Sequence, residues 1–517
     1  MYPNRFSLPA FKFFTLILIL VSVFIFQTQA QHTRKPNIIY ILADDLGYGD
    51  IGDYGQQKIE TPNIDKLANE GIRFTQHYTG APVCAPARCI LLTGRHSGHS
   101  QVRGNDEWAD RGNVWSYKAM IADSTLEGQQ PLANGTITIA HLLQNAGYKT
   151  GLVGKWGLGA PHTQSTPLAM GFDFFFGYNC QRQAHTYYPV HLYKNDKRVF
   201  LNNDTVAPHS KLPGNADLYN PDSYKAFTLN EYAPDLMFSE ITGFVAENRK
   251  NPFFLYWATP IPHTALQAPK RWIDYYVKKF GDEKPYDGSS GYFPVRYPHA
   301  TYAAMISYLD EQIGLLVKQL KELGIYENTL IVFTSDNGPT FTGGTDSPWF
   351  NSAGPFKSEY GFGKGFLNEG GIRVPMIASW PGITEPGRVS QHQSAFQDVL
   401  PTFCEIADIQ ITDDIDGLSF LPELKGMKQE KHQYLYWEFP EYGGQQAVII
   451  GKWKALRKNM HKGNTTWELY NLETDPSETT DLAAANQSVI AEVEKIVLKE
   501  HVKSGNKNWW FNVLGDK

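Results

Sequence analysis

The chain has 517 residues, 42% of them hydrophobic, which is enough for a large core and for more than one subdomain. Its formal net charge of −6 at pH 7 gives no basic footprint, so no nucleic-acid partner is expected. Any anionic ligand must be held by local basic residues and not by the overall field of the protein.

The first 30 residues are typical of an export signal. Arg5 and Lys12 precede an apolar run from Phe13 to Phe26, and Ala30 offers a small residue for cleavage. The run is short for a bilayer span and fits the apolar region of a signal peptide better. We therefore predict a signal peptide over residues 1–30, an exported protein that is periplasmic or extracellular, and no stable membrane insertion. A retained anchor is the weaker alternative.

Five apolar segments further along the chain are predicted to be strands. They lie in residues 36–45, 148–157, 251–263, 327–338 and 370–382. Between them, residues 61–71 favour a short helix that ends at a glycine. Residues 301–324 favour a long helix, because apolar residues recur there at helical spacing and Gly324 closes it. This alternation predicts an α/β fold with a large, mixed and mostly parallel sheet, whose ligands bind beyond the carboxyl ends of the strands.

The pattern changes from about residue 430. Short strands with turn signals are predicted in residues 433–439, 445–458 and 465–472, followed by a helix in residues 486–503. We predict a catalytic domain over residues 31–430 and a smaller α+β subdomain with an antiparallel sheet over residues 431–517.

Polar residues end two of the predicted strands. Asp44 and Asp45 close the first, and Asp336 and Asn337 close the fourth. Three carboxylates together would repel one another unless a cation lies between them, and oxygen donors suit Ca²⁺ or Mg²⁺. Each aspartate alone could equally be a helix cap or a turn residue.

The chain has four cysteines: Cys84, Cys89, Cys180 and Cys404. Disulfides are permitted in an exported protein, and the simplest of the three possible pairings is Cys84–Cys89 with Cys180–Cys404. Cys84 and Cys89 do not have the usual zinc spacing. From the residues alone, Cys84 could be half of a disulfide, a metal ligand, a nucleophile or a chemically altered side chain.

Residues 84–88 read Cys-Ala-Pro-Ala-Arg, and residues 92–95 read Leu-Thr-Gly-Arg. This stretch resembles the signature of the type I, formylglycine-dependent sulfatases, although its fourth position is often Ser and here is Ala87. The resemblance continues in the family's order to about residue 385 and includes a small C-terminal subdomain. Its further motifs are Asp44-Asp45, Gly154-Lys155-Trp156, Pro262-His263, Ser335-Asp336-Asn337-Gly338 and Gly363-Lys364-Gly365. It implies a fold like that of alkaline phosphatase.

The resemblance also implies a mechanism. In this family a formylglycine-generating enzyme oxidises the motif cysteine, here Cys84, to an aldehyde that is hydrated to a diol. One diol oxygen attacks sulfur while the alcohol departs; the other then loses its proton, the carbonyl re-forms and sulfate leaves. The implied cofactors are this formylglycine and a Ca²⁺ (or Mg²⁺) ion held by Asp44, Asp45, Asp336, Asn337 and the modified Cys84.

Four more residues receive roles from the resemblance. Arg88 would hold the diol, and Lys155 and Lys364 would bind sulfate oxygens. His263 would be the general acid for the departing alcohol, because a histidine pKa can lie near neutral pH. Outside these contexts, a surface lysine and a loop histidine are the ordinary interpretations.

One position departs from the family pattern. The second motif commonly reads Gly-Lys-x-His, whereas this chain has Gly157 where the histidine is expected. His185 and His99 are the candidates to replace it.

The expected partner is a sulfated carbohydrate, and the expected reaction is release of sulfate from polysaccharide fragments. Candidate contacts to the sugar are Arg103, Asn105, Gln181, Arg182 and His185, with ordinary loop polarity as the alternative. Two other functions stay open: a phosphodiester or phosphonate hydrolase of the same superfamily, and a non-catalytic protein that binds sulfated glycans.

Overall fold

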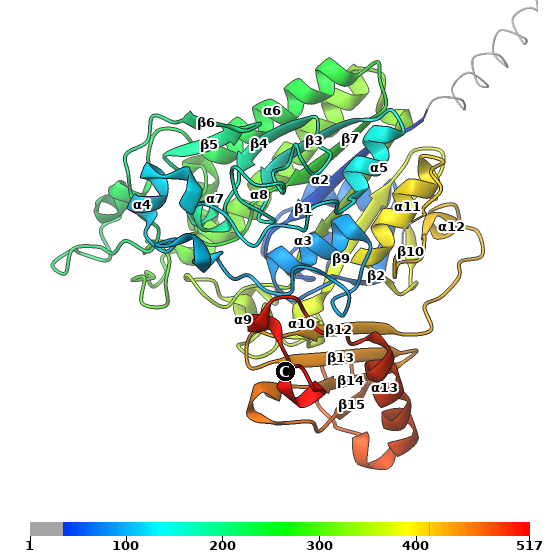
Figure 1. The fold of residues 1–517 in the computed structure, drawn as a ribbon. Helices are drawn as coiled ribbons and strands as arrows, with labels where there is room; N and C mark the ends of the chain where they lie inside the picture. The colour runs from blue at the N-terminus through cyan, green and yellow to red at the C-terminus, as the bar shows by residue number, and fades with distance from the viewer. Residues whose placement is uncertain (1–34, 413) are drawn as a thin grey trace, which may run out of the picture.

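The computed structural model describes residues 35–412 and 414–517. A large domain is built on an 11-stranded sheet, and a smaller one on a 4-stranded sheet near the C-terminus (Figure 1). The predicted signal peptide lies outside the described residues. Among those that are described, no helix combines the length and the apolar character needed to cross a membrane.

The strands of the large sheet are β1 (Asn37–Ala43), β2 (Ile72–Tyr78), β3 (Lys149–Lys155), β4 (Phe174–Tyr178), β5 (His191–Lys194), β6 (Lys197–Phe200), β7 (Phe253–Ala258), β8 (Thr329–Ser335), β9 (Arg373–Ser379), β10 (Arg388–Ser390) and β11 (Ser394–Ala395). Their order is β10-β2-β9-β8-β1-β7-β3-β4-β5-β6, with β11 beside β2. The central strands from β8 to β4 are parallel, and β9, β5 and β6 pair antiparallel. This arrangement confirms the predicted fold class and all five predicted strands, which are β1, β3, β7, β8 and β9.

Helices cover both faces of the large sheet (Figure 1). In the large domain they are α2 (Pro62–Asn69), α3 (Cys84–Thr93), α4 (Tyr117–Ala122), α5 (Ile139–Asn145), α6 (Ala233–Asn248), α7 (Lys270–Phe280), α8 (Pro298–Glu322), α9 (Ser347–Phe350), α10 (Glu369–Ile372), α11 (Val399–Ile406) and α12 (Leu421–Leu424). The short and the long predicted helices are confirmed as α2 and α8.

The side chains of β1 alternate between two cores. Ile39 and Ile41 face the core that contains α2, α6 and α8, while Tyr40 and Leu42 face the core that contains α3, α5 and α11. Both faces of β1 are fully buried, as expected for a central parallel strand. Packing on both faces holds β1 in place, and with it the position of Asp44 and Asp45 at the end of the strand.

The smaller domain consists of β12 (Leu435–Phe439), β13 (Gln445–Ile450), β14 (Trp453–Arg457), β15 (Glu468–Asn471) and α13 (Gln487–Glu500). All of its strand pairs are antiparallel, as predicted. A buried ion pair ties it to the large domain, since Lys454 Nζ lies 2.9 Å from Glu369 Oε1 of α10 and 2.9 Å from Glu478 Oε1. Removing the lysine would leave the buried Glu478 carboxylate without a cation, while Glu369 would keep Arg373, at a cost of about 3–5 kcal/mol.

The simplest disulfide pairing is wrong, because all four cysteines are free and buried. Cys84 and Cys89 lie on α3, where five positions along a helix turn the two side chains to different faces. Cys180 instead contacts Met120, and Cys404 lies on α11.

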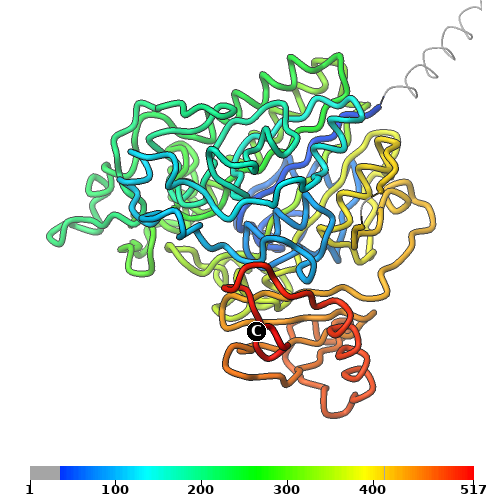
Figure 2. Tube along the Cα trace, viewed as in Figure 1, coloured from blue at the N-terminus to red at the C-terminus, as the bar shows by residue number. Residues whose placement is uncertain are grey.

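A second contact between the domains joins two histidines to two acids. His96 Nε2 lies 3.0 Å from Glu500 Oε2, and His99 Nδ1 lies 2.9 Å from Asp416 Oδ1. The Gly98 N–H donates to His96 Nδ1, so the other ring nitrogen carries the proton that Glu500 accepts. Figure 2 shows the red chain near residue 500 passing beside the blue chain near residue 100.

This cluster should give the protein a stability maximum in mildly acidic solution. The hydrogen bond to Asp416 raises the pKa of His99 above the ordinary 6.5. The stabilisation from protonated His99 is therefore lost as the pH rises through the pKa that His99 has in the folded protein. The hydrogen bond from His96 holds the pKa of Glu500 well below 4.5. The stabilisation from ionised Glu500 is therefore lost as the pH falls below about 4.5. We expect Tm to fall from about pH 6 to about pH 9, and to fall less steeply in His99→Gln. If the Tm of the wild type and the Tm of His99→Gln fall equally over this pH range, this prediction is contradicted.

Candidate active site

Two neighbouring parallel strands bring the predicted metal ligands together. Asp44 and Asp45 directly follow β1, and Asp336 and Asn337 directly follow β8. β1 and β8 pair in register, with Ala43 opposite Ser335, so the two polar pairs end at one edge of the sheet. Asp45 has a φ of 67°, in the left-handed region that non-glycine residues rarely occupy. Its N–H donates to Asp336 Oδ1 at 3.2 Å.

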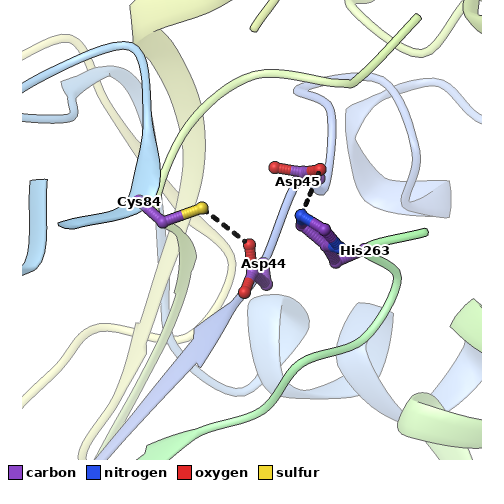
Figure 3. Close-up of side chains that lie close together, drawn as sticks. All are labelled: Asp44, Asp45, Cys84 and His263. Atoms are coloured by element: carbon purple, nitrogen blue, oxygen red, sulfur yellow. Dashed lines mark hydrogen bonds and ion pairs between the residues drawn. The ribbon is translucent and has the colours of Figure 1, made fainter. Parts of the chain in front are cut away.

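Helix α3 begins at Cys84 and points this end at the carboxylates. Cys84 Sγ lies 3.1 Å from Asp44 Oδ1 (Figure 3). One turn further along, Arg88 Nη2 lies 2.9 Å from Asp336 Oδ2 and 3.2 Å from Asp44 Oδ2. Arg88 Nη1 also donates to the Lys155 carbonyl at 2.6 Å. Because Cys84 and Arg88 are four residues apart on a helix, their side chains lie on one face and both contact Asp44.

Both predicted lysines reach the same site. Lys155, at the end of β3, places its Nζ 2.6 Å from Asp44 Oδ2. Lys364 places its Nζ 2.6 Å from Asp45 Oδ1 and 3.6 Å from Cys84 Sγ. With Arg88, these side chains offset the charges of the three carboxylates, so mutual repulsion does not by itself require a metal ion here.

Two orphaned oxygens are the better sign of a metal site. Asp45 Oδ2 and Asn337 Oδ1 are buried and accept no hydrogen bond from the described residues. Asn337 Nδ2 donates to Asp45 Oδ1 at 2.8 Å, which turns the amide oxygen away from that contact. Burying such acceptors without a partner is costly, and an oxygen-preferring cation would satisfy both. One ligand atom each from Asp44, Asp45, Cys84 and His263 lie within 4.8 Å of one another.

The electrostatics of the site keep Cys84 protonated while Asp44 is ionised. Burial, together with Asp336 and Asp44, raises the pKa of the Cys84 thiol well above its ordinary value. Burial alone would raise the pKa of Asp44, but Lys155, His263 and Arg88 hold it well below 3.8. An unmodified Cys84 is therefore a weak nucleophile at neutral pH, because the thiolate is the reactive form.

Two histidines form the opposite wall. His263 Nε2 lies 3.7 Å from Asp45 Oδ2 (Figure 3), and its Nδ1 contacts the Thr264 carbonyl. The His185 ring stacks on His263, with ring centres 5.3 Å apart and planes at 15°. Burial lowers the pKa of both rings well below 6.5, and Lys364 lowers that of His263 further. The resting site therefore holds two neutral imidazoles. An arriving sulfate would raise the pKa of His263 again, because its negative charge favours the protonated ring.

The candidates to replace the missing histidine differ in position. His185 contacts His263, whereas His99 lies in the cluster between the two domains with Asp416 and Glu500. The side chain of Gln181 fills the space beside Gly157. A Cβ built on this glycine would lie 2.9 Å from Gln181 Cγ, and the glycine φ of 73° also disfavours any other residue.

The structure separates the other candidate sugar contacts. Asn105 Oδ1 accepts from the Ala85 N–H at 2.8 Å and from Gln181 Nε2 at 3.3 Å, so both residues lie at the start of α3. Arg103 is not brought to the site. It is 3% exposed, and its guanidinium binds Glu438 and the carbonyls of Ser100 and Gly98.

Sequence reasoning missed two residues of the site. Tyr292 contacts His263 with ring centres 5.8 Å apart, and His209 contacts His185 at 5.6 Å. Both have positive φ, 61° for Tyr292 and 69° for His209, in a region that had no predicted element. No motif signalled them, because only the folded loops bring them to the strand ends.

Comparisons with known proteins point in one direction. The family model described as "Sulfatase" matches residues 36–409, and the model described as "N-sulphoglucosamine sulphohydrolase, C-terminal" matches residues 358–506. The chain is 30% identical to N-acetylgalactosamine-6-sulfatase of Mus musculus, over 86% of this chain and 75% of that protein. It is 29% identical to arylsulfatase A of Homo sapiens, over 90% of this chain and 87% of that protein.

Solved structures agree. The protein Ps i-CgsB in complex with k-i-k-neocarrahexaose has a TM-score of 0.72 and 29% identity, covering 92% of this chain and 95% of that one. Phosphonate monoester hydrolase of Agrobacterium radiobacter shares the fold, with a TM-score of 0.61, 19% identity, and coverage of 90% and 95%.

Proposed function

The chain belongs to the sulfatase family and is a sulfuric ester hydrolase, and we propose that it removes sulfate from sulfated sugars through a formylglycine made from Cys84 beside a bound Ca²⁺ ion. The observation that carries this proposal is the setting of Cys84. It is fully buried at the start of α3, between Asp44 and Lys364, with a thiol that stays protonated. Such a thiol is a poor nucleophile for direct attack on sulfur, so the reaction needs a chemically altered side chain at this position.

The residues of the site fit both a formylglycine at Cys84 and a bound cation. Asp44, Asp45, Asp336 and Asn337 would hold the ion, and the free Asp45 Oδ2 and Asn337 Oδ1 support this set. When bound, the hydrated aldehyde supplies an oxygen nucleophile, and the ion supplies stabilisation of negative charge. Lys364 can keep its contact to Asp45 Oδ1 meanwhile, because the other carboxylate oxygen is the free one.

Lys155 and Lys364 are the residues that we assign to the sulfate oxygens. Lys155 is fully buried and the Lys364 side chain is 12% exposed at the carboxylate cluster, and the negative charges nearby raise the pKa of each. They stay charged when water is excluded, so they can stabilise the charge that develops on the sulfate in the transition state. Arg88 forms ion pairs with Asp44 and Asp336 and so holds both carboxylates in place.

His263 is assigned to the departing alcohol. Its Nδ1 faces the Thr264 carbonyl, which leaves Nε2 toward the centre of the site. The sulfate charge favours protonation of this ring, so binding of substrate prepares the acid that the leaving group needs. His185 stacks on this ring and is our candidate for the role of the histidine missing at Gly157.

Sulfated sugars are proposed as the substrate class. The relatives named above include an N-acetylgalactosamine-6-sulfatase and a protein crystallised with k-i-k-neocarrahexaose. We assign sugar contacts to Asn105 and Gln181, which lie at the start of α3, and to His185, which stacks on His263. Maturation by a formylglycine-generating enzyme and export through residues 1–30 belong to the same proposal.

Matched aryl esters test the reaction itself. We expect the wild-type protein to hydrolyse 4-nitrophenyl sulfate with a kcat/KM at least about 100-fold above that for the matching phosphate or phenylphosphonate. The reverse preference would favour the phosphonate hydrolase. That reading has little support in the site, because the described residues place one histidine among the acids of the cluster and a two-zinc centre needs more. Binding of sulfated sugars without turnover would favour the non-catalytic alternative.

A further inference from the structure

Arg182 is a cation whose donors are not used. It lies on the short helix η4 (Gln181–His185), and its Nε and Nη1 are buried without a hydrogen-bond partner in the described part of the chain. No carboxylate of the described residues lies within ion-pair distance of it. Buried N–H groups of a charged side chain are rarely left unpaired, so this pair of donors points to a ligand.

Glu107 does not neutralise this arginine. It is the acid that acts on Arg182 electrostatically, but its Oε2 is directed at Cys180 Sγ, 3.9 Å away. Burial raises the pKa of Glu107 to about 7, so a large part of the carboxyl group is uncharged at neutral pH. Glu107 therefore cancels the positive charge of Arg182 only in part.

An exposed tryptophan supports the guanidinium. The Arg182 Cζ lies 5.0 Å from the ring centre of Trp115, which is 63% exposed just before α4. Cation–π contact holds the guanidinium in one orientation, while the rest of the indole is open to a sugar ring. The Trp115 ring buries little apolar surface, so packing in the core does not account for it.

Arg182 shares the short helix η4 with two residues of the active site. Gln181 and His185, the neighbours of Arg182 on η4, both face the reactive cluster. His209 lies beyond His185, since its ring contacts the His185 ring, and burial together with the charge of Arg182 lowers its pKa. A series of contacts therefore runs from Asp45 through His263 and His185 to His209.

We propose that Arg182 and Trp115 form a subsite for a second anionic group, a sulfate or a carboxylate, on the sugar next to the one that loses its sulfate. This inference rests on the proposed function and narrows it to substrates with at least two negative groups. A guanidinium carries several N–H donors in one plane, which suits the oxygens of a sulfate or carboxylate. Trp115 would stack on the same sugar.

Disaccharides test this subsite. All carry the hydrolysed sulfate at one position, and the neighbouring sugar is neutral, sulfated or a uronic acid. We expect wild-type kcat/KM to be about 10- to 100-fold higher with the anionic neighbour than with the neutral one. In Arg182→Gln this ratio should fall close to one, mainly through KM. Arg182→Lys should keep part of it for sulfate and less for carboxylate, because lysine lacks the planar pair of donors.

The controls separate the subsite from the reaction. Arg271→Gln, which removes another arginine that lies over a tryptophan, should leave the ratio at its wild-type value. A ratio near one in the wild type, or an unchanged ratio in Arg182→Gln with the same Tm, would overturn the inference while sulfate release still supports the reaction. Absence of sulfate release from every ester would remove the proposed function, and the subsite with it.

Discussion

Replacing Cys84 with alanine is expected to lower kcat for sulfate release by at least about 10⁴-fold, because alanine cannot be converted to the aldehyde that supplies the nucleophile. Lys155, Lys364 and His263 would remain, but they act on a reaction that no longer has an attacking group in place. The substitution removes a single sulfur atom, so the protein should fold and keep a Tm close to that of the wild type. The measurement is initial rates on an aryl sulfate and on a sulfated disaccharide.

Cys89 provides the matched control on the same helix. Its Sγ accepts from Ser100 at 3.3 Å and faces away from the reactive cluster, so Cys89→Ala should retain activity. In active wild-type protein, the tryptic peptide from Phe74 to Arg88 should have lost sulfur and gained an aldehyde oxygen. Full activity in protein whose Cys84 is still a thiol would contradict the proposed mechanism.

The parts of the fold that sequence could predict are those with strong local patterns. β1 and β8 are continuous apolar runs, since both faces of a central parallel strand are buried. The short strands β5, β6, β10 and β11 were missed, because two to four residues carry no period and gain their pairing only from neighbours. β2 was also missed, since its central residues Arg73, Thr75 and Gln76 interrupt the apolar pattern.

The same division holds in the active site. Asp44, Asp336 and Lys155 follow strands that sequence could place, and register then brings them together. Arg103 shows the opposite case. It follows the cysteine motif closely in the chain, yet it is buried against Glu438 of the smaller domain, a contact between residues 335 positions apart. Closeness along the chain is a poor guide where a loop turns away from the strand ends.

Contacts within loops account for the remaining misses. Tyr292 and His209 come from segments without periodicity, and their places depend on left-handed backbone turns that no residue pattern marked. The repulsion argument for a metal ion was also incomplete, because sequence could not show that Lys155, Lys364 and Arg88 would contact the three carboxylates. Only the structure reveals the two orphaned oxygens that favour an ion here.

The second large effect concerns those oxygens. Treatment with a chelator is expected to abolish activity and lower Tm, and Ca²⁺ should restore both. An ion that binds only the folded protein stabilises it by about 2.7 kcal/mol at 100 times its Kd. The Asn337 amide oxygen is buried without a hydrogen bond, so replacing it with alanine removes one ligand and breaks no ion pair of the site.

In Asn337→Ala we therefore expect the Ca²⁺ concentration for half-maximal activity and for half of the Tm rise to increase together, by at least about tenfold. The activity measured in low Ca²⁺ should fall more than about 100-fold, and saturating Ca²⁺ should recover much of it. Asn69→Ala, at an exposed asparagine of α2, should respond to Ca²⁺ like the wild type. If Ca²⁺ changes neither Tm nor rate in chelator-treated wild type, the two oxygens hold no such ion and Lys155, Lys364 and Arg88 must balance the cluster alone.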